Sequence, residues 1–301
     1  MNFVHLLLPD FSLILCGYLV CRYTALDRTV WQQVERLVYF FLFPVLLFHS
    51  IVKSPLELSS ASALIGAGLT MSISGIALAY ALPWLPWLGR HIDRRDHVAS
   101  AQIGFRFNSF IALALADRLA GPQGQVQIAV LIGVCVPLLN LAAVWPMVRH
   151  ARTGLLRELV RNPLILATVS GLAANLLGFQ LPDWLVPSVS RIGAASIALG
   201  LMAAGAGLHL TSLASGRVLA VSVLSVRHLA LPLIAFGLAR LFELTTVQTT
   251  MLMVFSALPT SSSSYVLAAR MGYNGPFVAG LVTLSTLLAM LSLPLALWLV
   301  R

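Results

Sequence analysis

Charged residues are scarce in this 301-residue sequence. Asp, Glu, Lys and Arg make up 10% of the residues, whereas hydrophobic residues make up 59%. A soluble domain has roughly a quarter of its residues charged and covers its surface with them. With 19 basic and 10 acidic residues and a mean hydropathy of +0.91, this chain cannot coat a water-exposed surface. The composition excludes a soluble enzyme or nucleic-acid-binding domain and predicts a protein solvated mainly by lipid.

Lysine and cysteine are also rare. Lys53 is the one lysine, beside 18 arginines. Cys16, Cys21 and Cys135 lie in or beside apolar runs without the paired spacing of a metal site, so we expect them to pack. The sequence contains no GxxxxGK[ST] phosphate-binding loop, so energy from ATP through such a loop is excluded. No catalytic residue, metal site, cofactor or nucleic-acid partner is therefore predicted.

Long apolar runs make up most of the chain. A membrane-spanning helix needs about 20 such residues, and short breaks with proline, glycine or charge separate the runs. The first run begins at the N-terminus, which lacks the basic start and small-residue cleavage site of a signal peptide. The other nine lie near residues 34–52, 61–85, 98–119, 126–148, 162–179, 187–208, 216–241, 246–269 and 276–300. The sequence predicts an all-α membrane protein with ten transmembrane helices.

Basic residues are divided unequally between the two sides of these predicted spans. The loops after odd-numbered spans contain 12 of them, and the opposite side contains five. Basic residues in short loops favour the cytoplasmic side of a membrane. We therefore expect the odd loops to be cytoplasmic and both termini to lie outside the cytoplasm.

A short internal repeat relates the two halves of the chain. Residues 115–121 read LADRLAG, and residues 267–272, which begin 152 positions later, read LAARMG. This offset is half the chain and pairs the fourth span with the ninth. Because five spans are an odd number, the second half must enter the membrane from the opposite side. The sequence predicts two inverted five-helix repeats, residues 1–150 and 151–301, an architecture common among secondary transporters.

Polar residues fall at equivalent places in the fourth and ninth spans. Under the half-chain offset, Asn108 and Ser109 lie opposite Thr260 and Ser261, and all four are residue types that begin helices. Pro259 lacks an N–H donor, so the ninth span is expected to break there. Two half-helix N-termini, each with about half a positive charge, then meet near the middle of the membrane. Such a pair of helix ends is an anion site.

Other interpretations of these residues stay open. Pro259 is compatible with a simple kink, and the serines with close helix packing. Arg106 lies about ten residues inside its span and needs a partner or a wet cavity; substrate contact and capping of its own half-helix both meet that need. For Arg227 and His228 we expect an ion pair or a water contact. Asn140 suits either a bond across helices or the transport path.

Several motifs, in order over nearly the whole chain, resemble the auxin efflux carrier family in its bacterial form. They are Pro44 within FFLFPVLLF, Arg106-Phe107-Asn108, Asn162-Pro163, Arg227 before Pro232, and Leu258-Pro259-Thr260 followed by AARMG. The resemblance implies a five-plus-five inverted repeat with crossed, unwound helices four and nine, and carriage of small organic anions such as malonate, malate or auxin-like carboxylates. Plant members have proline at both crossings and a long central loop. This chain has only Pro259 there, and a loop of about a dozen residues at 149–161.

We interpret the sequence as a secondary transporter of small organic anions that works by alternating access in the bacterial inner membrane. Membrane lipid is the other expected partner, and a homodimer is left open. The residues expected to form the substrate site are Arg106, Asn108, Ser109, Asn140, Pro259, Thr260, Ser261, Ser262 and Tyr265.

Two alternatives remain from the sequence. One is a sodium-coupled symporter of the same architecture, which is disfavoured because Asp10 and Asp117, the acids inside the spans, lie near span ends. The other is an intramembrane enzyme acting on lipid, for which no nucleophile with an aligned base is visible.

Overall fold

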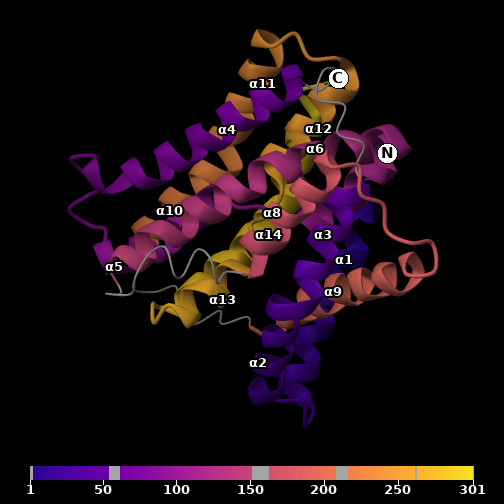
Figure 1. The fold of residues 1–301 in the computed structure, drawn as a ribbon. Coiled ribbons are helices and arrows are strands. Elements are labelled where there is room, and N and C mark those ends of the chain that lie inside the picture. The colour runs from indigo at the N-terminus through magenta and orange to yellow at the C-terminus, as the bar shows by residue number, and fades with distance from the viewer. Residues whose placement is uncertain (1–2, 54–61, 151–162, 208–215, 262, 301) are drawn as a thin grey trace.

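The computed structural model describes residues 3–53, 62–150, 163–207, 216–261 and 263–300, and every regular element in these ranges is helical (Figure 1). In chain order the elements are α1 (Phe3–Tyr23), α2 (Arg28–Leu37), η1 (Val38–Leu42), α3 (Phe43–Lys53), α4 (Ser62–Ala81), η2 (Leu82–Trp84), α5 (Arg94–Ser100), η3 (Ala101–Gly104), α6 (Ser109–His150), α8 (Pro163–Leu176), α9 (Val186–Ala206), α10 (Arg217–Ser225), η5 (Val226–Ala230), α11 (Leu231–Leu241), α12 (Thr246–Ala257), α13 (Ser263–Arg270) and α14 (Gly275–Trp298).

Five helical stretches among the described residues are long and apolar enough to cross a membrane. They cover residues 62–84, 130–147, 186–203, 217–241 and 275–298. Together with the absence of strands from the described ranges, they confirm an all-α membrane protein. The ten-span inverted repeat stays a prediction.

Turns of π-helix interrupt two of the apolar stretches. η1 joins α2 to α3, and η5 joins α10 to α11. In each case a proline, Pro44 or Pro232, follows two residues after the π-helical turn. A proline ring collides with the carbonyl four residues before it, and here those carbonyls belong to Phe40 and His228, inside the turns. Widening the helix to π geometry accommodates that collision without ending the helix.

Gly121 divides α6 into two helices. Its φ of 56° and ψ of −145° are not helical, and a residue without Cβ adopts such a positive φ at little steric cost. The division falls in the break that the sequence predicts between its fourth and fifth apolar runs.

Helix packing sorts the elements into two groups. In the first group, α1, α2, α3, α8 and α9 contact mainly one another. In the second, α4, α6 and α10 to α14 surround the largest apolar core. Both groups draw helices from both halves of the chain. The two ends of the chain lie together in the upper right of Figure 1, while α2, α5 and α13 lie toward the lower side.

Candidate functional site

Two non-helical segments meet inside the second group of helices. Residues 105–108 separate η3 from α6, and residues 258–261 follow α12. The backbone N–H of Asn108 donates to the carbonyl of Pro259, with an N–O distance of 2.9 Å. The two interruptions therefore touch through their main chains, one residue away from the Asn108–Thr260 pairing that the half-chain offset predicts.

Asn108 also begins α6. Its Oδ1 accepts from the N–H of Ile111 at 3.3 Å, and its carbonyl accepts from the N–H of Ala112 at 3.1 Å. These contacts are typical of a helix N-cap, and Ser109 is the buried first residue of the helix. The start of α6, where partial positive charge collects, thus lies at the contact between the two segments.

In the other segment, the N–H of Thr260 donates to Ser285 Oγ of α14 at 2.9 Å. Ser261 Oγ lies 2.7 Å from Ser263 Oγ in the first turn of α13. Ser262, which the sequence also assigns to the site, lies outside the described residues. Side chains of α13 and α14 therefore fix the segment on both sides of the point where it meets Asn108.

The buried guanidinium of Arg106 joins three elements. Nη1 donates to Gln102 Oε1 of η3 at 2.9 Å. Nη2 donates to Asn140 Oδ1 of α6 at 3.2 Å and to Ser263 Oγ of α13 at 2.7 Å. All three acceptors are side-chain oxygens, so Arg106 does not use these bonds to cap the carbonyls of its own half-helix. It links the two interrupted stretches instead.

Three buried polar atoms around these segments have no hydrogen-bond partner among the described residues. They are Asn140 Nδ2, Thr260 Oγ1 and Ser264 Oγ. Because Asn140 Oδ1 accepts from Arg106, its Nδ2 is a free donor. A buried polar group left unsatisfied costs about 1–3 kcal/mol. All three atoms can donate, so the arrangement favours a ligand rich in hydrogen-bond acceptors.

Arg227 closes the C-terminal end of α12. Its Nε donates to the carbonyl of Leu258 at 2.7 Å and its Nη2 to the carbonyl of Phe255 at 3.1 Å. The last carbonyls of a helix carry partial negative charge, which a cation compensates. Among the described residues Arg227 therefore binds backbone carbonyls rather than the partner of an ion pair, and it belongs to a site to which sequence reasoning did not assign it.

His228 links both sides of the same interruption through α14. Its Nε2 lies 2.9 Å from Ser285 Oγ, which accepts from Thr260, and its Nδ1 lies 2.8 Å from Ser292 Oγ. Ser292 Oγ in turn donates to the carbonyl of Ala257 at 3.3 Å. No sequence pattern indicates a role for Ser285 or Ser292, because both lie inside an apolar run without other polar motifs.

Tyr265 lies apart from this cluster. Its hydroxyl donates to the carboxylate of Glu35 in α2, across the two helix groups. The structure therefore brings together Arg106, Asn108, Asn140, Pro259 and the segment at 260–261, with Ser109 beginning the adjoining helix, and directs Tyr265 elsewhere.

An all-helical membrane protein with buried polar residues at interrupted helices has the features of a transporter. Residues 89–297 match the family model described as "Membrane transport protein", and the chain belongs to this family. It is also similar to a protein of Rhizobium meliloti (strain 1021) named "Putative malonate transporter", with 26% identity over 98% of this chain and 95% of that protein. These findings confirm the resemblance to the auxin efflux carrier family.

Proposed function

We propose that this protein is a secondary transporter that carries small organic anions, such as malonate, across the bacterial inner membrane. The anion binds where the fourth and ninth spans are interrupted and cross. The observation that carries the proposal is the set of unpaired donors at Asn140, Thr260 and Ser264. A carboxylate has only acceptors to offer, and each of the three groups can donate to it.

Charge at the interruptions also favours an anion. The N-terminus of α6 begins at the contact, and Arg106 adds a full positive charge beside it. Arg227 neutralises the opposite, negative end of α12. Positive helix ends without a nearby carboxylate are the environment in which backbone binds anions.

Burial of the site supports alternating access. Thr260 is 1% exposed and Asn108 6% exposed, so neither side of the membrane reaches them directly. Movement of the second helix group against the first would open the site to each side in turn. Residues 1–150 and 151–301 supply corresponding spans to each group: the first two of each half to one, and the last three to the other. This division supports an inverted repeat.

Replacing the hydroxyl of Thr260 tests the site. Thr260→Val and Ser264→Ala each remove a donor that has no partner among the residues in the structure's described ranges, so we expect thermal stability in detergent to be kept. Each loses one hydrogen bond to a charged ligand, worth about 1.5 kcal/mol, so malonate binding should weaken roughly tenfold. Calorimetric titration and counterflow of labelled malonate in vesicles measure the two effects.

Thr286→Val is the matched control. This hydroxyl is also buried in the second helix group, but it donates to the carbonyl of Val282 at 2.8 Å. The control should bind malonate as the wild type does. Wild-type affinity in a Thr260→Val, Ser264→Ala double variant would rule out the crossing as the anion site.

A further inference from the structure

A second basic site lies at the far end of α13 from the interruption. A cavity of about 440 Å³ is bounded by α2, α13 and the start of α14. This volume is in the range of small-molecule sites, roughly 300–1,000 Å³. α13 has eight residues, and at about 1.5 Å per residue its two ends lie roughly 12 Å apart. The cavity is thus one short helix away from the proposed crossing site.

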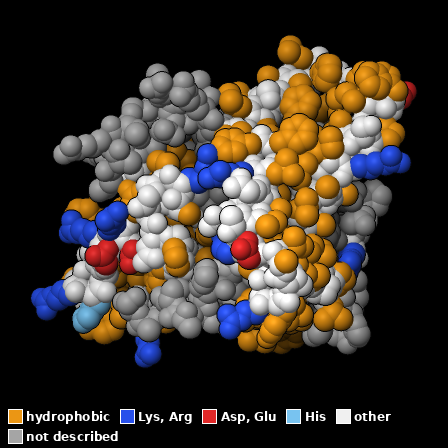
Figure 2. Space-filling view, turned by 90° about the horizontal axis from the view of Figure 1, so that it is seen from below, with side chains coloured by type: hydrophobic (Ala, Val, Ile, Leu, Met, Phe, Trp, Pro, Cys, Tyr) orange, Lys and Arg blue, Asp and Glu red, His pale blue; other side chains and the backbone are white. Residues whose placement is uncertain are grey.

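Positive charge dominates the lining of this cavity, which we call the arginine pocket. Arg28, Arg36 and Arg270 line it, and the one acid among its lining residues is Glu35. Figure 2 views the molecule from the lower side of Figure 1 and shows Lys and Arg side chains spread over that face. An excess of two positive charges around a concave site attracts anions.

Glu35 is already bound as a carboxylate ligand would be. Its Oε1 accepts from Arg28 Nη1 at 2.8 Å, and the Tyr265 hydroxyl donates to its Oε2. The Arg28 guanidinium also lies 5.2 Å from the centre of the Tyr265 ring. Charge-assisted hydrogen bonds of this kind recognise carboxylates strongly. The pocket therefore contains a carboxylate-binding geometry that is occupied by a side chain of the protein.

The other two arginines of the pocket, Arg36 and Arg270, are not paired with a described carboxylate. Arg270 is exposed and lies over the ring of Phe40 at 4.0 Å, and Arg36 donates to Gln33 Oε1 at 3.4 Å. Of the three arginines that line the pocket, Arg28 is the one with a salt bridge to a described carboxylate, that of Glu35. No carboxylate of the described chain therefore neutralises Arg36 or Arg270.

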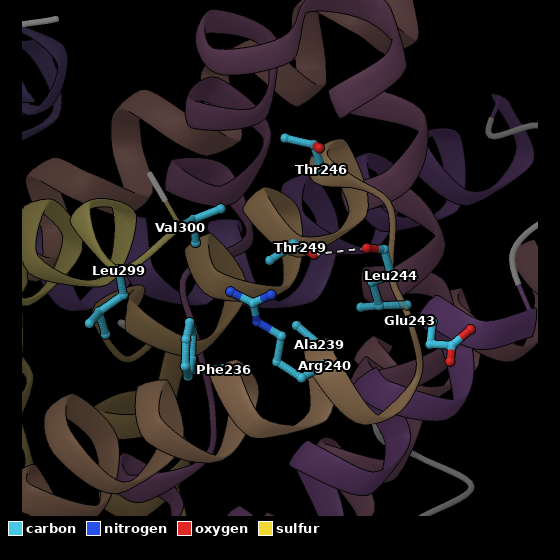
Figure 3. A pocket seen from close by; sticks show the side chains of 9 residues that line it. All are labelled: Phe236, Ala239, Arg240, Glu243, Leu244, Thr246, Thr249, Leu299 and Val300. Atoms are coloured by element: carbon cyan, nitrogen blue, oxygen red, sulfur yellow. Dashed lines mark hydrogen bonds between the residues drawn. The ribbon is translucent and has the colours of Figure 1, made fainter.

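A second cavity of the same volume gives a useful contrast. It lies between α11, α12 and the C-terminal end of α14, and its charged lining residues are Arg240 and Glu243, whose charges cancel. Figure 3 shows the Arg240 guanidinium pointing toward Thr249 and Val300. Its arginine also lies over an aromatic ring, Phe236, at 5.4 Å. The excess of positive charge, rather than the presence of an arginine, distinguishes the arginine pocket.

We propose that the arginine pocket is an entry site for the transported organic anion, and that Glu35 is a tethered carboxylate which competes with that anion for Arg28 and Tyr265. This inference rests on the proposed function. Glu35 belongs to α2 in the first helix group, and Tyr265 to α13 in the second. When an anion displaces Glu35, its hydrogen bond with Tyr265, which joins the two groups at this pocket, is lost. Arrival of substrate then releases the groups whose relative movement opens the crossing site.

Sided transport assays with malonate test this proposal. The assay uses vesicles of both orientations, so that malonate can be supplied from the side of the membrane on which the arginine pocket lies, called the α13 end. From that side, Arg28→Gln and Arg270→Gln should each raise the half-saturating malonate concentration about fivefold. Glu35→Gln removes the competing charge and should lower that concentration by a similar factor. Supplied from the other side, malonate should half-saturate all three variants within twofold of the wild type. Added salt should weaken entry from the α13 end, because exposed charges are screened.

Arg240→Gln is the matched control and should change neither side more than twofold. If Glu35→Gln leaves the half-saturating concentration unchanged or raises it, Glu35 is not a competitor and the proposal is wrong. Wild-type values in both arginine variants also overturn it, whereas the crossing site stands if Thr260→Val still weakens transport from both sides. If the wild type neither binds nor exchanges malonate or related carboxylates, the proposed function fails, and the entry site falls with it.

Discussion

Arg106 carries a full charge into the protein interior, at 5% exposure. Hydrogen bonds to a charged group contribute about 1.5–3 kcal/mol each and offset part of the loss of hydration. Its acceptors come from η3, α6 and α13, so one guanidinium fixes both interrupted stretches. By holding Asn140 Oδ1 it also leaves Asn140 Nδ2 free to donate. We therefore assign Arg106 a positioning role for the anion site.

Substitutions of Arg106 separate charge from geometry. Arg106→Lys keeps the charge but loses the planar guanidinium, whose Nη2 donates to both Asn140 Oδ1 and Ser263 Oγ. We expect malonate affinity to fall about tenfold, and stability to fall by about 2 kcal/mol as acceptors lose their donors. Arg106→Gln should show both losses in greater degree, whereas the exposed Arg94→Gln should show neither. Calorimetry and thermal unfolding measure these effects, and wild-type affinity in Arg106→Lys would exclude the positioning role.

Part of this residue-level arrangement was predictable. A charge inside an apolar run must be satisfied, which draws attention to Arg106, and Gln102 lies four residues before it on the same stretch. Ser263 is 157 residues away along the chain, so no local pattern reveals that contact. Tyr265 illustrates the opposite difficulty, because it is close to the interruption in sequence but its hydroxyl reaches Glu35 across the helix groups.

Helix interruptions form the proposed anion site, and contacts from other elements hold them. Around residues 258–260, Arg227 binds the carbonyl of Leu258, Asn108 binds the carbonyl of Pro259, and Ser285 accepts from Thr260. None of these three bonds depends on the missing N–H of Pro259. The proline disfavours a continuous helix, and we expect the surrounding bonds to keep the segment open without it.

Two variants distinguish the contribution of Pro259 to the interruption from that of the hydrogen bonds around it. Pro259→Ala should keep the interruption, and we expect transport within about threefold of the wild type. Arg227→Met leaves two buried carbonyls unpaired, at about 1–3 kcal/mol each, and should lower both stability and transport. Arg217→Met, at the exposed start of α10, is the control. Counterflow and thermal unfolding give the comparison; loss of transport in Pro259→Ala with normal stability would show that proline itself maintains the break.

The two interruptions differ in how much their local sequence indicates. Pro259 and the polar residues after it mark one of them directly. The other, at residues 105–108, contains no proline, and only the capping tendency of Asn108 marks it. Its backbone is held by a partner at Pro259, 151 residues away along the chain. Such a bond exists only once both stretches have packed, and a single sequence does not encode it locally.

At the scale of the whole molecule, the two helix groups meet mainly where α6 contacts α3 and α8 and where α14 contacts α9, and the bond from Tyr265 to Glu35 joins them at the arginine pocket. Glu35 is the buried acid among the described residues, and it lies at this end rather than at the crossing. Where α2 meets α13, the contact between the groups is therefore a polar one, the hydrogen bond from Tyr265 to Glu35, which a competing ligand can replace. Apolar packing holds each group together internally. Apolar periodicity in the sequence predicts helices, but it does not show which helices form a group, because that depends on contacts between distant spans.

The orientation of these groups in the membrane is open to direct measurement. The unequal distribution of basic residues predicts that the loop before α5 is cytoplasmic and that the loop between α11 and α12 lies outside. His91 and Thr246 are exposed residues of these two regions, and neither is an Arg or Lys whose loss would alter the distribution. After replacement of Cys16, Cys21 and Cys135 by serine, His91→Cys should react with an impermeant maleimide only from the cytoplasm, and Thr246→Cys only from outside. Equal transport by both variants controls for folding. The reverse labelling pattern would place the arginine pocket outside the cytoplasm, and it would then serve uptake rather than export.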